Sequence, residues 1–203
     1  MDEFIVPCSE KHRNFLYKTP IIDNYDNILI ELKNFIYSSG YLDNLSIDSA
    51  KQFDWDYFRD QCPKLYDWFD SQGIACSVAK VLNVPPYTQG WIHSDIGEKG
   101  AELALNIGIE NAVNNWNIFY KIKGRPENTS STPGQNEPWI YFNEGNRENV
   151  ESIDEIGRYD LTLPKIFNTR IPHRVLNFTE SRRIVTTFRF DPDLDINAIK
   201  FYD

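Results

Sequence analysis

The sequence is poor in the residues that build several common frameworks and sites. Its 203 residues include three cysteines, three histidines and one methionine. The cysteines, Cys8, Cys62 and Cys76, are odd in number and form no C-x-x-C pair. This pattern argues against a secreted disulfide framework and against a cysteine-rich zinc site. We therefore expect free thiols in a reducing, cytoplasmic compartment.

Long apolar runs are also missing. No stretch of about 18 apolar residues occurs, which is the length that a membrane-spanning helix needs. Residues 1–14 contain no apolar core of the kind found in secretory signals. The sequence therefore predicts neither a signal peptide nor a membrane partner.

Positive charge is scarce as well. Lysine and arginine number 21 against 30 aspartates and glutamates, which gives a net charge of −9 and an isoelectric point near 4.9. Proteins that bind nucleic acid mainly through its phosphates carry a basic face. The composition therefore disfavours nucleic acid as a partner. It leaves the oligomeric state open.

The chain has the length and the apolar content of one folded domain, with 41% hydrophobic and 14% aromatic residues. Apolar residues at helical spacing predict a helix over 25–36, with Gly40 as its C-terminal cap. Pro63 and Gly73 predict the start and end of a second helix. We divide the single domain, 1–203, into a helical N-terminal support (1–73), a catalytic β core (74–190) and a C-terminal tail (191–203).

From residue 74 the apolar period changes to two, as in strands. Many short strands without helices between them indicate an antiparallel sandwich or jelly roll. The polar segment 124–137 predicts a long loop, and we expect substrate contacts within 124–157. The expected strands are 74–82, 103–109, 116–122, 139–142, 160–163, 165–167, 174–177 and 183–190.

One set of residues has the pattern of a metal site. His93 and Asp95 are two residues apart, so in a strand their side chains point to the same face. His173 stands at the start of a later predicted strand. Two histidines and one carboxylate on one face of a metal form the facial triad of non-haem Fe(II) oxygenases. The remaining histidine, His12, lies among polar residues, and we expect it at the surface.

Arg183 begins the apolar strand 183–190, where an arginine is costly unless it is paired. A guanidinium pairs best with a carboxylate, which a dicarboxylate co-substrate such as 2-oxoglutarate supplies. Arg189 shares the strand face of Arg183. We expect a structural salt bridge for Arg189, with a second contact to co-substrate or substrate as the alternative.

These motifs resemble those of the 2-oxoglutarate/Fe(II)-dependent dioxygenase superfamily. The resemblance rests on HSD at 93–95, PH at 172–173 and Arg183 ten residues later. The stretches ALNIGIENA (104–112), WNIFY (116–120) and PKIFNTRIPHRVLNFTESRRIVTTFRF (164–190) resemble a poorly characterised branch known in part from phage and bacterial genomes. The resemblance covers roughly residues 74–190 and implies a double-stranded β-helix, the cupin-like jelly roll, supported by the N-terminal helices.

The resemblance also implies the roles of individual residues. It implies that Fe(II) is bound by His93, Asp95 and His173, which are then the catalytic residues, and that 2-oxoglutarate is held by Arg183. A second polar contact to the co-substrate is implied for Asn106 and Tyr120, as a weaker transfer.

The segment RIVTTFR also echoes the Arg-x₅-Arg pattern of the nucleic-acid demethylases in this superfamily. The spacing from His173 to Arg183 is shorter than in that branch, and the net charge opposes phosphate binding.

We therefore expect a hydroxylase. The expected enzyme uses Fe(II), 2-oxoglutarate and O₂ to hydroxylate a C–H bond of a peptide or protein side chain, or of an amino-acid-like small molecule. Two alternatives remain. One is a metal-binding cupin-like jelly roll with non-oxidative chemistry, which would have no need of Arg183. The other is a pure binding role, in which the His93–Asp95 pair is accidental.

Overall fold

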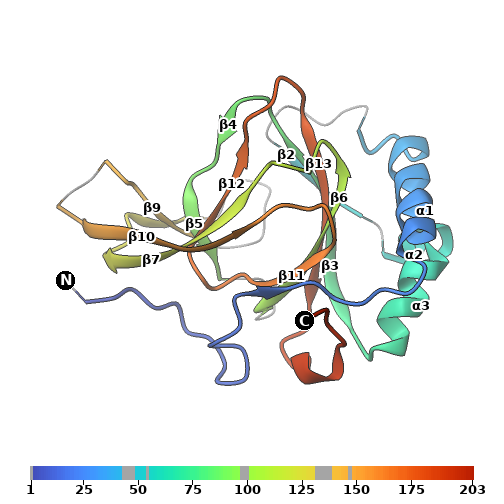
Figure 1. Ribbon diagram of the computed structural model, residues 1–203, viewed down its shortest axis with the longest axis horizontal. Coiled ribbons are helices and arrows are strands. Elements are labelled where there is room, and N and C mark those ends of the chain that lie inside the picture. Colours follow the sequence, from blue (N-terminus) through green and yellow to red (C-terminus); the bar gives the residue numbers. More distant parts are fainter. Residues whose placement is uncertain (1, 43–48, 54, 97–100, 131–138, 146–147) are drawn as a thin grey trace.

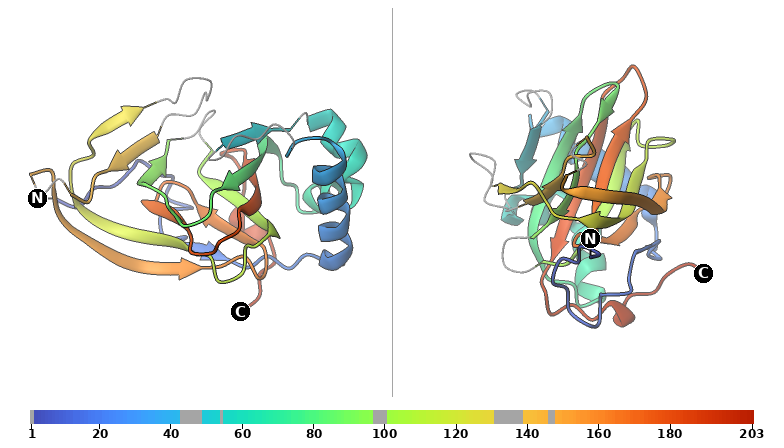
Figure 2. Two further views of the ribbon diagram at one scale, coloured as in Figure 1. Left: turned by 90° about the horizontal axis from the view of Figure 1, so that it is seen from above. Right: turned by 90° about the vertical axis from the view of Figure 1, so that its left-hand side faces the viewer.

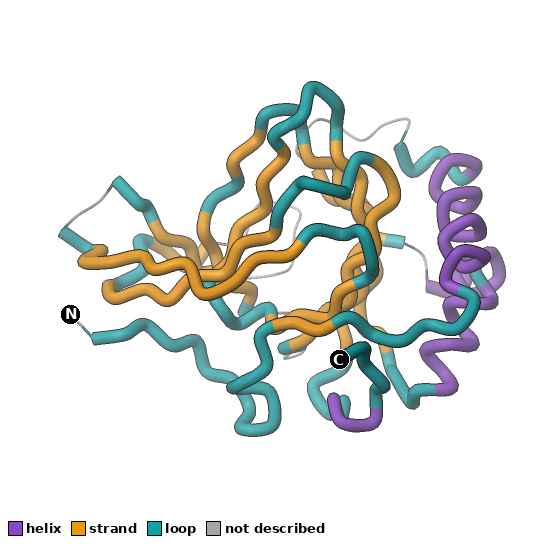
Figure 3. Tube along the Cα trace, viewed as in Figure 1, coloured by secondary structure: helices purple, strands orange, loops and turns teal. Residues whose placement is uncertain are grey.

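The computed structural model describes residues 2–42, 49–53, 55–96, 101–130, 139–145 and 148–203. Two antiparallel sheets face each other, and helices pack on the outer face of one of them (Figure 1 and Figure 3). Seen from above in Figure 2, the order is helices, six-stranded sheet and then the seven-stranded sheet, which extends away from the helices. The expected mainly β double-stranded β-helix is therefore confirmed.

The two sheets draw on strands from the whole chain. The six-stranded sheet has the order β1 (Tyr17–Lys18), β11 (Lys165–Asn168), β6 (Leu103–Glu110), β13 (Arg183–Phe190), β3 (Cys76–Val84) and β2 (Ser49–Gln52). The seven-stranded sheet has the order β10 (Val150–Tyr159), β7 (Asn117–Gly124), β12 (His173–Asn177), β5 (Ile92–Asp95), β9 (Trp139–Phe142) and β8 (Asn128–Ser130), with β4 (Thr88–Gln89) paired to β12.

The helices are α1 (Tyr25–Ser38), α2 (Trp55–Gln61), α3 (Pro63–Ser71) and the short 3₁₀ helix η2 (Ile196–Ala198). Gly40 and Gly73 have φ angles of 67° and 64°, so both stand in the left-handed region that ends helices. The predicted ends of α1 and α3 are thus confirmed. Among the described residues, no helix is long and apolar enough to cross a membrane.

The helices cover a layer of buried aromatic side chains. Phe188 on β13 is fully buried, and its ring centroid lies 5.4 Å from Phe58 of α2 and 5.3 Å from Phe69 of α3. Because side chains alternate along a strand, Arg183, Val185, Thr187 and Arg189 point to the opposite face, toward the other sheet. Strand β13 therefore carries the packed core on one face and the polar interior on the other.

Two expectations about local structure are wrong, and one strand was not predicted. Segment 160–163 is a turn, because the Asp160 carboxylate accepts hydrogen bonds from the backbone N–H groups of Asn114 and Thr162. The preceding ten residues form β10, whose polar and half-exposed side chains lack the apolar alternation that indicates a strand. The expected loop 124–137 contains the short strand β8, and its residues 131–137 lie outside the described part.

The N-terminal and C-terminal regions are also more than a helical support and a tail. Residues 1–73 contribute edge strands β1 and β2 to the six-stranded sheet. In the C-terminal segment, Leu194, Ile196 and Ile199 are buried in the same core as the helices.

Candidate metal and co-substrate site

The three predicted metal ligands meet on the inner face of the seven-stranded sheet. His93 on β5 and His173 on β12 are direct cross-strand partners, and their ring centroids are 4.5 Å apart. Asp95 lies two residues after His93 on the same strand. The ligating atoms of the three side chains all lie within 4.8 Å of one another.

Backbone carbonyl groups fix the orientation of both imidazoles. Nδ1 of His93 donates to the carbonyl oxygen of Trp91 at 2.9 Å, and Nδ1 of His173 donates to that of Ile171 at 2.8 Å. A carbonyl oxygen only accepts, so the proton of each neutral ring is on Nδ1. Each Nε2 therefore offers a lone pair, and each lies 3.9 Å from the Asp95 carboxylate.

Arg189 of the facing sheet holds the carboxylate of Asp95. Its Nη2 donates to Oδ2 of Asp95 at 2.7 Å. Burial alone would raise the pKa of Asp95, but Arg189 and the two histidines outweigh it and hold this pKa well below its usual range. The salt bridge expected for Arg189 is present, and its partner is a candidate metal ligand.

His173 is suited to bind a cation rather than a proton. Burial, followed by the neighbouring charge of His93, lowers its pKa from 6.5 to about 3. The rings of Phe119 and Phe167 lie 5.8 Å and 5.4 Å from its imidazole. This apolar surround keeps the ring neutral, which is the form that binds metals.

Arg183 is fully buried on the inner face of the six-stranded sheet. Its Nη1 donates to the carbonyl oxygen of Leu176 at 3.2 Å, while Nε and Nη2 have no partner among the described residues. Burial lowers its pKa to about 10. A buried guanidinium with unused donors is what a carboxylate ligand would satisfy.

Tyr159 lies near Arg183, and two buried asparagines adjoin Tyr159. Asn106 Nδ2 donates to the Tyr159 hydroxyl at 3.3 Å, and Asn106 Oδ1 has no partner among the described residues. Arg183 lies close enough to influence the pKa of Tyr159, which burial raises. Asn117, the cross-strand partner of Tyr159, is buried, and its Nδ2 also lacks a partner in the described part. Sequence reasoning missed Asn117 and Tyr159; an asparagine at the start of the predicted strand 116–122 was the available signal for Asn117.

The structure does not bring Tyr120 to the other predicted site residues. Its neighbour Phe119 faces His173, so Tyr120 points to the other face of β7. There it packs with Ile118 and Ile122, and its ring lies 5.2 Å from the Arg174 guanidinium.

The expectation for His12 is wrong. This histidine is 1% exposed, and its Nδ1 lies 2.7 Å from the Glu102 carboxylate. Its Nε2 lies 3.2 Å from the carbonyl oxygen of Leu194. A histidine in a polar sequence is buried here because an acid and a carbonyl group from distant segments satisfy both ring nitrogens.

The residues present fit both groups that the sequence predicts. Two neutral imidazoles and one carboxylate suit Fe(II), for which this donor set is typical. The nitrogens of Arg183 and Asn117 that have no partner in the described part of the chain suit a buried carboxylate. The two halves of the site are linked across the sheets by the Asp95–Arg189 and Asn106–Tyr159 contacts.

Comparisons with known proteins support the fold. No family model and no curated protein matches the sequence. Among solved structures, the non-haem α-ketoglutarate-dependent carbocyclase SnoK of nogalamycin biosynthesis aligns with a TM-score of 0.57 at 10% identity, over 88% of this chain and 81% of its own.

Two other structures are similar. The epimerase SnoN, in complex with Fe³⁺, α-ketoglutarate and nogalamycin RO, has a TM-score of 0.54 at 10% identity and covers 89% of this chain and 80% of its own. A prolyl-4-hydroxylase from Pseudomonas putida has a TM-score of 0.50 at 10% identity, with coverage of 90% and 95%. At such low identity the likeness establishes the fold, which is the one these 2-oxoglutarate-dependent enzymes use.

Proposed function

We propose that the protein is a non-haem Fe(II), 2-oxoglutarate-dependent oxygenase. The observation that carries this proposal is the pairing of two features between the same two sheets. One is the inward-facing set His93, Asp95 and His173. The other is Arg183, which is fully buried and has two nitrogens without a partner among the described residues. A hydrolytic or purely structural metal site would not need such a guanidinium.

Each residue has a role in this proposal. His93 and His173 bind Fe(II) through Nε2, and Asp95 binds it through its carboxylate while Arg189 fixes that carboxylate in place. Arg183 and Asn117 donate to the distal carboxylate of 2-oxoglutarate, and Tyr159 lies where its hydroxyl can add a third contact. When bound, iron and 2-oxoglutarate supply an oxidation by O₂ that is coupled to decarboxylation of the co-substrate to succinate.

For the substrate, we propose a peptide or protein side chain, or an amino-acid-like small molecule, hydroxylated at a C–H bond. The similar structures include a carbocyclase, an epimerase and a prolyl hydroxylase, so the fold itself serves several outcomes. The side chain of His93 is 19% exposed whereas those of Asp95 and His173 are 5% and 6% exposed, so a substrate would approach from the His93 side.

The proposal is tested by anaerobic titration of the purified protein with Fe(II) and then 2-oxoglutarate, followed by exposure to O₂. We expect both ligands to bind and succinate to form. The His93→Ala variant should lose iron binding, whereas Arg183→Met should keep iron and lose 2-oxoglutarate. If the wild-type protein bound neither Fe(II) nor 2-oxoglutarate, the proposal would be overturned. Metal binding without 2-oxoglutarate binding would favour the non-oxidative alternative.

A further inference from the structure

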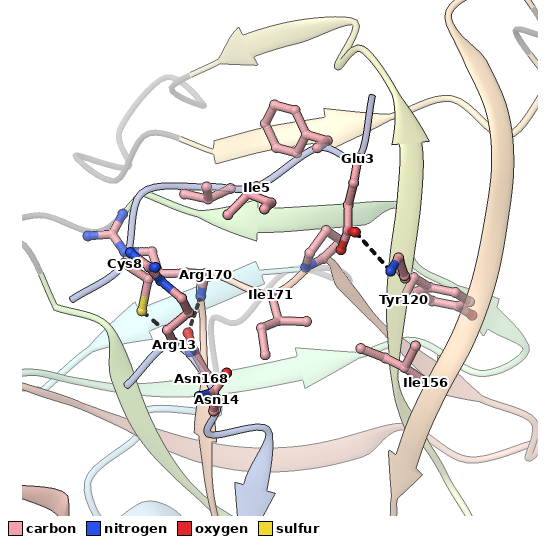
Figure 4. A pocket seen from close by; sticks show the side chains of 14 residues that line it. Glu3, Ile5, Cys8, Arg13, Asn14, Tyr120, Ile156, Asn168, Arg170 and Ile171 are labelled. Carbon is pink, nitrogen blue, oxygen red and sulfur yellow. Dashed lines mark hydrogen bonds and ion pairs between the residues drawn. The ribbon is translucent and has the colours of Figure 1, made fainter. Parts of the chain in front are cut away.

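A cavity lies beside the segment that supports the candidate metal ligands Asp95 and His173. It has a volume of about 290 Å³ and is bounded by the N-terminal segment, strands β7 and β10 and the segment 168–172. Figure 4 shows Cys8, Arg13, Asn168 and Arg170 gathered at one end and Tyr120 and Ile156 at the other. Because Tyr120 faces away from His173, this cavity is separate from the proposed co-substrate site.

The first end of the cavity carries two arginines that form no ion pair with a described carboxylate. Arg170 is 8% exposed, and its Nη1 donates only to the carbonyl oxygens of Asp95 and Ile96. Its Nε is buried and has no partner among the described residues. No carboxylate of the described part lies within ion-pair distance of Arg170 or of the exposed Arg13. A buried arginine without a direct ion-pair partner is uncommon, and an anion bound in the cavity would supply one.

The nearby carboxylates are already engaged. Glu3, at the other end of the cavity, forms an ion pair with Lys121 at 2.8 Å. Glu102 accepts hydrogen bonds from Ser9 and lies 2.7 Å from Nδ1 of His12. Glu102 and Asp95 offset part of the positive charge of Arg170 from a distance, but neither forms an ion pair with Arg170 or with Arg13.

The rest of the wall is largely apolar. Ile5, Val6, Ile156, Ile171 and Pro172 line it. Ile156 is 47% exposed although it is a large aliphatic residue, so a ligand there would remove apolar surface from water. The cavity thus combines a cationic end with an apolar body.

We propose that this cavity is a binding site for a small amphipathic carboxylate. The ligand's carboxylate would pair with Arg13 and Arg170, and its apolar chain would lie toward Ile171 and Ile156. A cavity of about 290 Å³ is at the lower end of the range for ligand pockets, so an eight-carbon acid is a suitable probe. This site is independent of the proposed oxygenase function.

The location of the site adds a structural link. Arg170 holds the backbone of Asp95, and the carbonyl group of Ile171 orients His173. One short segment, 168–172, therefore lines the cavity and supports two of the candidate metal ligands.

The test is titration of the full-length protein with octanoate, followed by ligand-observed NMR and calorimetry. 1-Octanol supplies the chain without the charge, and acetate supplies the charge without the chain. We expect saturable one-site binding of octanoate, and binding of the other two that is at least about tenfold weaker.

Variants locate the site. Arg13→Gln should weaken octanoate by about fivefold or more, and Ile156→Glu by about tenfold or more, because the new carboxylate repels the ligand. Both positions are exposed enough to leave folding intact, which circular dichroism checks. Arg125→Gln is the matched control, since Arg125 is exposed and lies outside the cavity. Non-saturable binding, equal affinity for 1-octanol, or equal effects of Arg13→Gln and Arg125→Gln would each overturn the proposal.

Discussion

The two faces of strand β13 differ in whether their buried side chains carry polar atoms without hydrogen-bond partners. On the helix-facing side, Phe188 and Phe190 are fully buried and packed against other aromatic rings. On the inner side, Arg183 is equally buried but keeps two nitrogens without partners in the described part. The same strand thus contributes packing on one face and binding capacity on the other. Burial alone does not distinguish the two faces, because both are buried. The hydrogen bonding of their polar atoms does.

The largest expected effect that separates the faces is on stability. Phe188→Ala should lower the free energy of unfolding by about 3–5 kcal/mol, because it opens a cavity between Phe58 and Phe69. Urea denaturation measures this loss. Ile30→Ala, at a 58% exposed position of α1, is the control and should cost less than about 0.5 kcal/mol. If Phe188→Ala changed metal affinity more than stability, the division between the faces would fail.

The inner face should respond in the opposite way. Arg183→Met should weaken 2-oxoglutarate by about 100-fold, while the ligand-free protein keeps or gains stability because an unpaired buried charge is removed. Calorimetry with Mn(II) in place of iron measures the affinity. The neighbouring Arg182, 41% exposed beside Glu110, provides the control Arg182→Met, which should bind normally. A strong loss of stability in Arg183→Met would show that Arg183 belongs to the core.

Arg189 tests the contact between the sheets. Arg189→Met should weaken Mn(II) by about 10–100-fold, because the Asp95 carboxylate loses the partner that orients it. Electron paramagnetic resonance of free Mn(II) gives the affinity, and Arg189→Lys should recover part of it. Unchanged Mn(II) affinity in the methionine variant would mean that Asp95 needs no support.

The pH dependence of stability sharpens the comparison further. The pKa of His173 is lowered from 6.5 to about 3 in the folded protein, so below pH 6.5 the unfolded chain binds a proton that the folded one excludes. Above pH 6.5, protonation of His173 therefore does not affect the free energy of unfolding. As the pH falls from 6.5 toward 3, this free energy decreases by at most about 1.4 kcal/mol per pH unit. Urea midpoints of the metal-free protein between pH 7.5 and 5 measure this. His173→Asn should flatten the curve, and an unaltered slope would contradict the assignment.

The smallest effect concerns two tyrosines on opposite faces of the seven-stranded sheet. Tyr159→Phe should weaken 2-oxoglutarate by about fivefold, or about 1 kcal/mol, since it removes a hydroxyl near Arg183. Tyr120→Phe should leave this affinity unchanged, because Tyr120 lies with Arg174 on the other face. Equal losses in both variants would place the co-substrate differently.

Much of the candidate site could be predicted from the sequence, because the alternation of side chains along a strand is a local property. The two-residue spacing of His93 and Asp95, and of the alternating residues of 183–190, determines which side chains share a face. Position 120 was predicted from the same strand as Asn117 and Phe119, but its odd offset from them puts it on the opposite face. Membership of a predicted strand did not show which face Tyr120 occupies, whereas the two-residue alternation of side chains along that strand did.

What the sequence could not supply was pairing between distant segments. His12 looks like a surface residue until Glu102 and Leu194 are brought to it. Strand β10 has no apolar alternation, and it forms because β7 offers it a long antiparallel partner. Both outcomes depend on tertiary contacts that no local pattern encodes.

The pairing of β5 with β12 has a mechanical consequence. The two strands are joined in register through a single residue pair, His93 and His173, and these are the proposed metal ligands. A bound ion would therefore add a cross-link at this pairing, between β5, β9 and β8 on one side and the rest of the sheet on the other. Removal of the ion with a chelator should separate β5 from β12 first. The amide hydrogens of β5, β9 and β8 would then exchange well before those of the helix-covered sheet.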